Sequence, residues 1–267
     1  MGNSGVNTVF IAGPAGSGKS MLTSTLALWF ERFEYSVCKV NLDPAAELLP
    51  YVPDVDVRRY VNARELMLKR GLGPNGALLA SMDELLNYVV EIKTEIEDCR
   101  ADYVLTDLPG QLEVIAFRLL GPRLLHELSE GSKAVMVFLV DARLVSRMYS
   151  AYSLLLLALS TMYRLNLPMV LAINKIDLVV DLTTYSGSKL YEKLYETIPI
   201  YRLLSEYSEC PSLITSESFL DVSISLQLCE VFRQFIKPPI PISAREAVGL
   251  DSLIAEIENT VATYKEG

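Results

Sequence analysis

The sequence predicts an α/β fold of three layers, in which helices flank both faces of a mostly parallel central sheet. Three observations support this prediction. Short apolar runs of strand length alternate with longer helical segments along the chain, which is the order that builds a parallel sheet. The runs are apolar throughout, as strands buried on both faces are. The chain has 267 residues, which is enough to bury a full core without disulfides or structural metal.

Apolar runs predict six strands along the chain. They cover residues 9–12, 37–42, 103–107, 134–140, 169–174 and 240–242. A helix is expected from Lys19 to about Phe33. The chain has no internal repeat, low-complexity tract or flexible linker, so a single domain over residues 1–267 is expected.

Two mostly helical insertions are expected within that domain. The first covers about residues 54–100 and is broken at residues 70–76, and the second covers about residues 181–237. A third helical segment, residues 148–163, is an uncharged run of 16 residues. It falls short of the roughly 20 residues that a membrane-spanning helix needs. We therefore expect a buried helix there and no membrane partner.

Composition excludes several classes of function. The formal net charge is −9 and no basic run is present, so direct nucleic-acid binding is not expected. Cys38, Cys99, Cys210 and Cys229 lie far apart without a CxxC pair, and His126 is the only histidine. These features predict reduced core thiols in a cytoplasmic protein, with no zinc site and no disulfide framework. No secretory signal is recognisable at the N-terminus.

A glycine-rich motif, GPAGSGKS, lies between the first expected strand and the first helix, and it fits the P-loop pattern G-x-x-x-x-G-K-[ST]. Glycines let backbone N–H groups converge on phosphate oxygens at a helix N-terminus. Lys19 is expected to reach the β- and γ-phosphates, and the Ser20 hydroxyl to bind Mg²⁺. The expected nucleotide contacts are Gly13, Pro14, Ala15, Gly16, Ser17, Gly18, Lys19, Ser20 and Met21.

Acidic residues end two further strands. Asp107 begins the sequence Asp-Leu-Pro-Gly-Gln, where its carboxylate could hold Mg²⁺ through water and Gly110 could turn its N–H towards the γ-phosphate. Asp43 follows the second strand in Asn-Leu-Asp-Pro-Ala. A carboxylate there can face the γ-phosphate and, with Gln111 nearby, orient the attacking water.

Two further motifs predict that the base is guanine. The fifth strand ends in N-K-x-D, whose final carboxylate can accept hydrogen bonds from guanine N1–H and the exocyclic amine. Adenine lacks that pair of donors, so a few kcal/mol favour guanine. A Ser-Ala-Arg sequence follows the sixth strand, where a backbone N–H can face guanine O6. The expected residues are Asn174, Lys175, Asp177, Ser243, Ala244 and Arg245.

Together these motifs resemble the GPN-loop GTPases, P-loop GTPases of the dimerising SIMIBI class, over essentially the whole chain. The element that names that family is Gly73-Pro74-Asn75, which lies here between Asp43 and Asp107. The resemblance implies a homodimer in which each such loop enters the partner's site in place of an arginine finger. Related dimeric ATPases have a second lysine where this chain has Pro14, which leaves Asn75 as the trans contact. The family commonly has Thr where this chain has Leu108.

The expected function is Mg²⁺-dependent conversion of GTP and water to GDP and phosphate by a homodimer that acts as a nucleotide-gated switch or assembly factor. The expected catalytic residues are Lys19, Asp43, Asn75 and Gln111. The resemblance alone implies a client related to RNA polymerase. A P-loop kinase of a small molecule or polynucleotide is the alternative, with Arg118 and Arg123 as candidate phosphate-binding residues. A metal-delivery GTPase would need Cys or His clusters that the sequence lacks.

Overall fold

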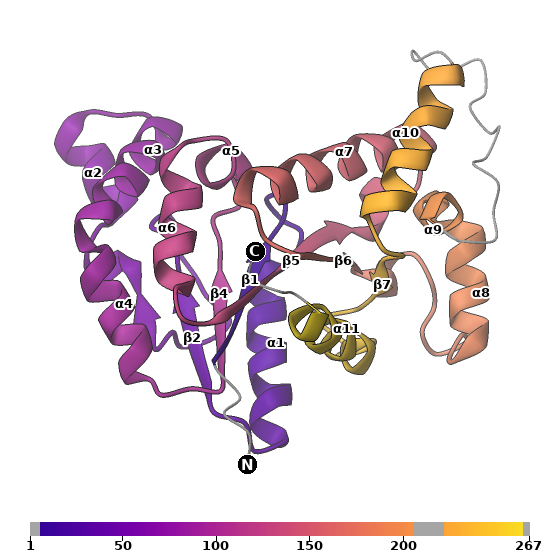
Figure 1. The fold of residues 1–267 in the computed structure, drawn as a ribbon, viewed down its shortest axis with the longest axis horizontal. Helices are drawn as coiled ribbons and strands as arrows, with labels where there is room; N and C mark the ends of the chain where they lie inside the picture. Colours follow the sequence, from indigo (N-terminus) through magenta and orange to yellow (C-terminus); the bar gives the residue numbers. More distant parts are fainter. Residues whose placement is uncertain (1–5, 205–221, 264–267) are drawn as a thin grey trace.

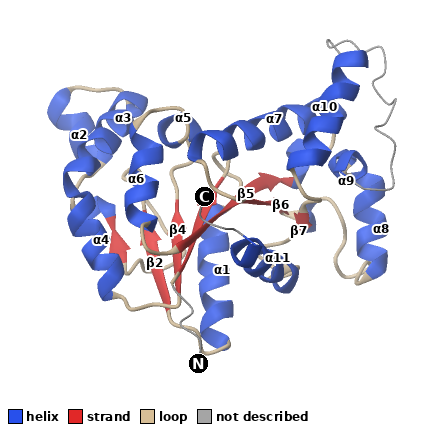
Figure 2. Cartoon of the chain, viewed as in Figure 1, coloured by secondary structure: helices blue, strands red, loops and turns tan. Residues whose placement is uncertain are grey.

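A seven-stranded sheet forms the centre of the protein in a computed structural model that describes residues 6–204 and 222–263. The strand order is β3-β2-β4-β1-β5-β6-β7, and all paired strands run parallel. Figure 2 shows the strands in red among the surrounding helices. The strands are β1 Asn7–Ala12, β2 Val37–Asn41, β3 Val55–Asp56, β4 Tyr103–Asp107, β5 Lys133–Asp141, β6 Met169–Asn174 and β7 Ile240–Pro241. The predicted α/β fold with a mostly parallel sheet is confirmed.

Helices cover both faces of this sheet (Figure 1). Helices α1 (Lys19–Arg32) and α11 (Leu250–Thr263) lie on one face, and the other helices near the sheet lie on the opposite face. The described helices between them are α2 Ala63–Arg70, α3 Pro74–Leu85, α4 Val89–Asp98, α5 Leu112–Ile115, α6 Leu120–Ser129, α7 Met148–Leu165, α8 Ser188–Thr197, α9 Pro199–Leu204 and α10 Val222–Phe235.

Alternate residues of the buried strands enter two separate cores. Val9 and Ile11 of β1 pack in one core with α1. Phe10 and Ala12 of the same strand belong to the larger core on the other face. This alternation follows from the two-residue period of a strand. It explains why a strand covered on both faces has no polar side, and why apolar runs located the strands well.

The first predicted helical insertion begins with non-helical structure. Residues 55–56 form β3, and a short 3-10 helix, η1 Val57–Arg59, precedes α2. A two-residue strand is too short to produce a recognisable pattern of alternating residues, so the sequence did not indicate it. The break predicted at residues 70–76 is present but shorter, since only residues 71–73 separate α2 from α3. In the second insertion the structure describes α8, α9 and α10, and residues 205–221 lie outside the described residues.

The uncharged run at residues 148–163 forms α7, but the prediction of a buried helix is wrong for one of its faces. Ala151, Leu155 and Ala158 are fully buried, whereas Tyr149 and Tyr163 are 56% and 85% exposed. Tyrosine carries no formal charge, so the run looked apolar while part of it faces solvent. Among the helices that the structure describes, none is both long and apolar enough to cross a membrane.

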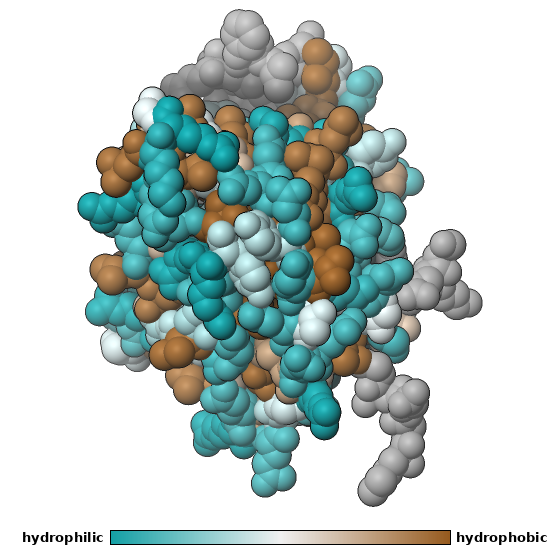
Figure 3. All heavy atoms as spheres, turned by 90° about the vertical axis from the view of Figure 1, so that its left-hand side faces the viewer, coloured by the Kyte–Doolittle hydropathy of each residue, from teal (hydrophilic) through white to brown (hydrophobic). Residues whose placement is uncertain are grey.

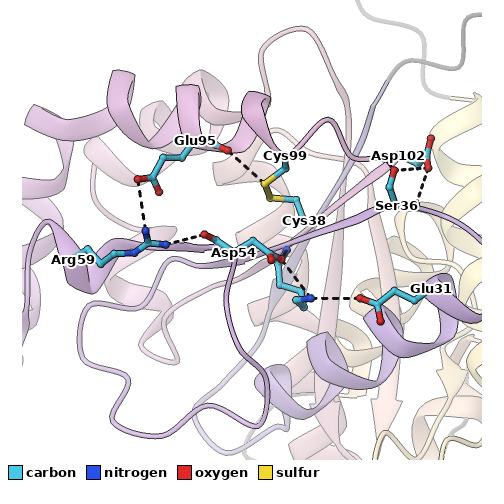
Figure 4. The surroundings of a disulfide bond; sticks show 9 residues. Glu31, Ser36, Cys38, Asp54, Arg59, Glu95, Cys99 and Asp102 are labelled. Atoms are coloured by element: carbon cyan, nitrogen blue, oxygen red, sulfur yellow. Dashed lines mark hydrogen bonds and ion pairs between the residues drawn. A yellow bond between two sulfur atoms is a disulfide. The ribbon is translucent and has the colours of Figure 1, made fainter.

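Cys38 and Cys99 form a disulfide, which corrects the prediction of separate reduced thiols (Figure 4). Cys38 lies on β2, and Cys99 follows the last residue of α4. They are 61 positions apart, yet their Cα atoms are 5.9 Å apart, because helices α2 to α4 fold the chain back onto β2. Sequence spacing could not reveal this tertiary contact. Cys229 is buried on α10, and Cys210 lies outside the described residues.

The disulfide predicts a difference in stability between oxidised and reduced protein. A cross-link over 61 positions restricts the unfolded chain and should add about 2 to 4 kcal/mol to the free energy of unfolding. Urea unfolding with and without reductant measures the loss on reduction. The free energy of unfolding lost on reduction should be about 2 to 4 kcal/mol smaller in Cys99→Ser than in the unmodified chain. Equal losses in the two proteins would contradict the cross-link.

Candidate nucleotide-binding site

The predicted site residues gather at one edge of the sheet. The glycine-rich loop follows β1, Asp43 follows β2, Asp107 ends β4 and Asn174 ends β6. Because the strands run parallel, their carboxyl ends share one edge, which is where ligands bind in open α/β sheets. Residues that are far apart in the chain thereby form a single site.

Glycine is required at two positions of the loop between β1 and α1. Gly13 and Gly18 have φ values of 143° and 100°. A Cβ at Gly13 would overlap the Leu139 carbonyl, and one at Gly18 would overlap the Asn174 side-chain amide. Gly18 caps α1 without a side-chain hydrogen bond, so the first turn of the helix presents backbone N–H groups to the loop. Such an arrangement binds phosphate.

Lys19 places its ammonium group inside this loop. Its Nζ donates hydrogen bonds to the Gly13 carbonyl at 3.1 Å and the Pro14 carbonyl at 3.3 Å. Burial lowers the pKa of Lys19, while the nearby carboxylates of Asp107 and Asp43 oppose that shift. The three side chains therefore form one charged group, with Lys19 and Asp107 buried and Asp43 half-buried, around the position expected for the terminal phosphate.

The Asp107 carboxyl is buried at the end of β4, and its pKa is raised. It is 2% exposed, and burial raises its pKa to about 6 against the opposing effects of the Ser20 hydroxyl, Lys19 and Tyr51. The Ser20 hydroxyl is therefore close enough to the Asp107 carboxyl to affect its pKa, as expected for the predicted pair of metal ligands. A hydroxyl beside a buried carboxylate is an oxygen donor set that fits Mg²⁺.

Tyr51 belongs to the site although the sequence did not single it out. Its hydroxyl donates to Asp107 Oδ2 at 3.2 Å, and burial raises the pKa of Tyr51 well above its ordinary value. Its only signal in the sequence is its position between Pro50 and Pro53, downstream of Asp43. A single tyrosine in a proline-containing loop has no recognisable motif, so only the fold reveals the contact.

Asn174 connects the phosphate loop to the segment after β7. Its Nδ2 donates to the Ser17 carbonyl at 2.9 Å, and its Oδ1 accepts from the Ala244 N–H at 2.9 Å. The side chain is buried. Removing it would leave two buried backbone groups without partners, which costs more than the bonds themselves contribute.

Asp177 lies beside this connection and is held by a hydroxyl. Ser243 Oγ donates to Asp177 Oδ1 at 2.6 Å and accepts from the Glu246 N–H at 3.2 Å. The chain turns sharply between Asn174 and Asp177, because Lys175 adopts a left-handed conformation with φ 65°. The turn directs these neighbouring side chains to different parts of the site.

Lys175 is anchored at two points. Its Nζ contacts the Gly16 carbonyl and pairs with Asp141 Oδ2 at 2.9 Å. Burial favours the neutral form of Asp141, but hydrogen bonds from Arg143 and Lys175 outweigh it and lower its pKa to about 2. The ionised Asp141 carboxylate, at the end of β5, therefore holds the Lys175 ammonium group beside the phosphate loop.

Asp43 lies near Lys19, at the beginning of the loop that follows β2. Its Oδ1 accepts from the Ala45 N–H at 2.9 Å. Burial raises the pKa of Asp43, and that hydrogen bond, Lys19 and Arg58 act in the opposite direction. Gly110 lies against the glycine-rich loop, since a Cβ there would be 3.1 Å from Ala15 Cα.

Four predicted contacts are not brought into this group of residues. Asn75 is exposed near the start of α3, which Gly73 caps and Pro74 begins. Gln111 caps α5 and is exposed, and the Arg245 side chain is 79% exposed. Met21 is 41% exposed on α1. Within the described residues, no hydrogen bond joins the Asn75 side chain to the glycine-rich loop of its own chain.

The raised pKa of Asp107 predicts how nucleotide-free stability depends on pH. Between about pH 4 and pH 6 the folded carboxyl holds a proton that the unfolded one has released, so its contribution to the free energy of unfolding falls as pH rises through this window. Above pH 6 the full cost of burying the charge is present. Asp107→Asn should therefore be more stable than the unmodified chain at pH 7 by about 2 to 3 kcal/mol.

Urea unfolding at pH 7 and pH 4.5, with EDTA and without nucleotide, measures this difference. The advantage of Asp107→Asn should shrink towards the lower pH. Glu192→Gln, at an exposed position on α8, is the matched control and should show no such trend. A destabilised Asp107→Asn at pH 7, or an advantage that does not change with pH, would contradict the assignment.

Comparison with known proteins identifies the family. Residues 11–263 match a family model described as a conserved hypothetical ATP binding protein. The chain is 31% identical to GPN-loop GTPase 3 of Dictyostelium discoideum over 96% of this chain and 87% of that protein. It is 34% identical to GPN-loop GTPase PAB0955 of Pyrococcus abyssi over 70% of this chain and 74% of that protein.

The solved structure of PAB0955, titled as a GTPase in apo form, resembles this chain with a TM-score of 0.78 and 26% identity. The alignment covers 96% of this chain and 98% of that one. Since the family model, the Dictyostelium relative and this structure each match nearly the whole chain, and the motifs meet at one edge of the sheet, the chain belongs to the GPN-loop GTPase family.

Proposed function

We propose that this chain hydrolyses GTP to GDP and phosphate with Mg²⁺ as cofactor, as a homodimeric nucleotide-gated switch or assembly factor. One observation carries the proposal. The buried Asn174 side chain bonds both to the phosphate loop at Ser17 and to the Ala244 backbone beside Asp177. The phosphate loop and Asp177 are thereby held where they can bind the triphosphate and the base of one nucleotide.

Guanine is the proposed base, although the matching family model is described as ATP binding. Ser243 donates to one oxygen of Asp177 and orients the carboxylate. An oriented carboxylate accepts two hydrogen bonds from guanine N1–H and the 2-amino group. Adenine has an acceptor at N1 and no 2-amino group, so it would leave the carboxylate unpaired. The relatives reported above are named GTPases.

Hydrolysis is assigned to the buried charges at the sheet edge. Lys19 would neutralise charge that develops on the γ-phosphoryl group, and Asp43 with Gln111 would orient the attacking water. Ser20 and Asp107 would hold Mg²⁺, which supplies positive charge to the phosphate oxygens when bound. Phosphoryl transfer requires positioning and electrostatic stabilisation rather than a covalent intermediate, so these residues suffice.

Apolar side chains exposed beside the site support a homodimer. Leu48 and Val52, in the loop after β2, are 93% and 82% exposed, and Leu119, directly before α6, is 84% exposed. Exposed apolar residues near one sheet edge are typical of an interface between subunits. Asn75 lies outside the site of its own chain, which is consistent with a contact to the partner's phosphates.

The face formed by α2, α3 and α4 is a weaker candidate for the interface. Figure 3 shows it as largely hydrophilic, with hydrophobic groups separated by polar ones. Its exposed apolar residues include Leu68 on α2 and Val90 on α4. We therefore assign the dimer contact to the edge that carries the nucleotide.

The kinase alternative has less support. Arg118 pairs with Asp83 at 3.1 Å, and Arg123 with Glu127 at 4.0 Å, so each guanidinium has a carboxylate partner within the chain. GTP turnover with no phosphate acceptor present would count against a kinase.

A protein client that binds the region of α8 to α10 is also a proposal. A client related to RNA polymerase follows from the family resemblance alone.

A cytoplasmic location stays a proposal. Disulfides are rare in the reducing cytosol of most organisms, so the state of Cys38 and Cys99 in cells bears on it directly. Thiol labelling of protein taken rapidly from cells would show whether this pair is reduced where the protein works.

Replacement of the base-reading carboxylate predicts a change of preference. Asp177→Asn presents an amide N–H₂ where guanine needs an acceptor, so GTP affinity should fall by about tenfold or more. Xanthosine triphosphate, which has a carbonyl in place of the 2-amino group, should bind the variant better than GTP. Isothermal titration with both nucleotides measures this. A variant that retains full GTP preference would refute the assignment of Asp177 to the base.

Mixed dimers test the trans contact. Lys19→Ala and Asn75→Ala chains should each be inactive alone, whereas an equal mixture should recover about a quarter of normal turnover, because half of the dimers then contain one complete site. Phosphate release after subunit exchange measures the recovery. A mixture as inactive as its components would mean that Asn75 does not act on the partner's nucleotide.

A further inference from the structure

The main chain at Asp43 is held by a side chain that the proposed mechanism does not use. Asn41, the last residue of β2, is fully buried. Its Oδ1 accepts from the Asp43 N–H at 3.1 Å, and its Nδ2 donates to the Asp43 carbonyl at 3.2 Å. One amide thus holds both peptide groups of the proposed catalytic residue.

Asp56 holds Asn41 in turn. Asn41 Nδ2 donates to Asp56 Oδ1 at 3.0 Å, and the two residues are opposite each other in the parallel pairing of β2 with β3. Asp56 is 9% exposed. Burial favours its neutral form, but hydrogen bonds from Arg58 and Asn41 outweigh that effect and lower the pKa of Asp56. The ionised carboxylate fixes which way the Asn41 amide points.

Arg58 links Asp56 to the Ala46 backbone, three residues after Asp43. Its Nε donates to both oxygens of Asp56 at 3.0 and 3.1 Å, and Nη2 donates to Oδ2 at 2.7 Å. The remaining nitrogen, Nη1, donates to the Ala46 carbonyl at 2.9 Å. The guanidinium therefore contacts a buried carboxylate on one edge and the loop backbone on the other.

Together these contacts secure the loop on both sides of Asp43. Asn41 holds the backbone of Asp43 and Arg58 holds the chain three residues later at Ala46, while the Ala63 N–H donates to the Pro44 carbonyl at 3.0 Å. A loop held at three points leaves its one catalytic side chain few orientations. Side chains that must be placed within about half an ångström depend on such support.

We propose that Asn41, Asp56 and Arg58 form a positioning unit that holds the Asp43 carboxylate where it can orient the attacking water. This inference rests on the proposed function, because it assigns Asp43 a role in GTP hydrolysis. Arg58 acts through the loop and not through contact with the nucleotide. Since the unit includes β3 and η1, the short elements that precede α2, it also connects the catalytic loop to the helices that carry Asn75.

The shape of arginine distinguishes positioning from charge alone. A guanidinium can donate to Asp56 and Ala46 at the same time, whereas a lysine ammonium is a single point of charge and cannot bridge both in this way. Arg58→Lys therefore keeps the charge and loses the bridge. Arg59→Lys is the matched control, because Arg59 is adjacent, about half exposed and bonded to the Asp54 carbonyl and to Glu95, and not to residues 43–46.

We expect Arg58→Lys to lower kcat for GTP by about 10- to 100-fold, because small misplacements of catalytic groups have effects of that size. KM and the dissociation constants for GTP and GDP should stay within about twofold of normal. Arg59→Lys should hydrolyse GTP normally. In the Asp43→Ala background, adding Arg58→Lys should cause no further loss, since the side chain that it positions is absent.

Each other outcome overturns the inference. An unchanged kcat in Arg58→Lys, or a further loss in the Asp43→Ala background, would show that the unit does not act through Asp43. A selective loss of GTP affinity with normal GDP affinity would mean that Arg58 contacts the γ-phosphate directly. Parallel losses of kcat, affinity and melting temperature would show a merely structural role. If the unmodified chain did not hydrolyse GTP at all, the proposed function would fail first, which is a distinct result.

Discussion

Two hydrogen bonds from the Asn174 amide hold the two halves of the site together. The phosphate loop lies after β1 and the base-reading segment after β7, at different positions across the sheet, and Asn174 on β6 bonds to both. The bonds are buried, so water cannot replace them without exposing the loop. The geometry of the remaining contacts depends on this link, because Lys175 and Asp177 follow Asn174 directly and take their positions from the end of the same strand.

Charge is distributed unevenly around this link. At the phosphate end, Lys19 and Asp107 are buried and Asp43 is half-buried, so one positive charge lies between two carboxylates and an excess of negative charge remains near Ser20. A bound cation would relieve that excess, which is a physical reason for Mg²⁺ to accompany the nucleotide. At the base end, Asp141 is compensated by Arg143 and Lys175 and remains ionised. Bound Mg²⁺ should therefore stabilise the protein mainly through the phosphate end of the site.

The helices between β2 and β4 are attached to the sheet at both ends of the segment. Helices α2 to α4 are tied to it at two places, by the Cys38–Cys99 disulfide at the end of α4 and by the Asp56 and Arg58 contacts before α2. Between these ties, the turn that carries Gly73, Pro74 and Asn75 is exposed. An exposed turn on a well-anchored pair of helices is suited to contacting a second molecule, because little ordering is needed on binding.

The sequence by itself determined six of the seven strands, the glycine-rich loop and the family. Apolar runs mark strands that are buried on both faces, and local motifs such as the GKS of the loop retain their spacing wherever the chain folds. Only the tertiary structure decided which distant residues meet. β3 has two residues, Tyr51 and Arg58 belong to no motif, and Cys38 and Cys99 are 61 positions apart. Contacts of that kind depend on how three helices return the chain to the sheet, and no local periodicity records that path.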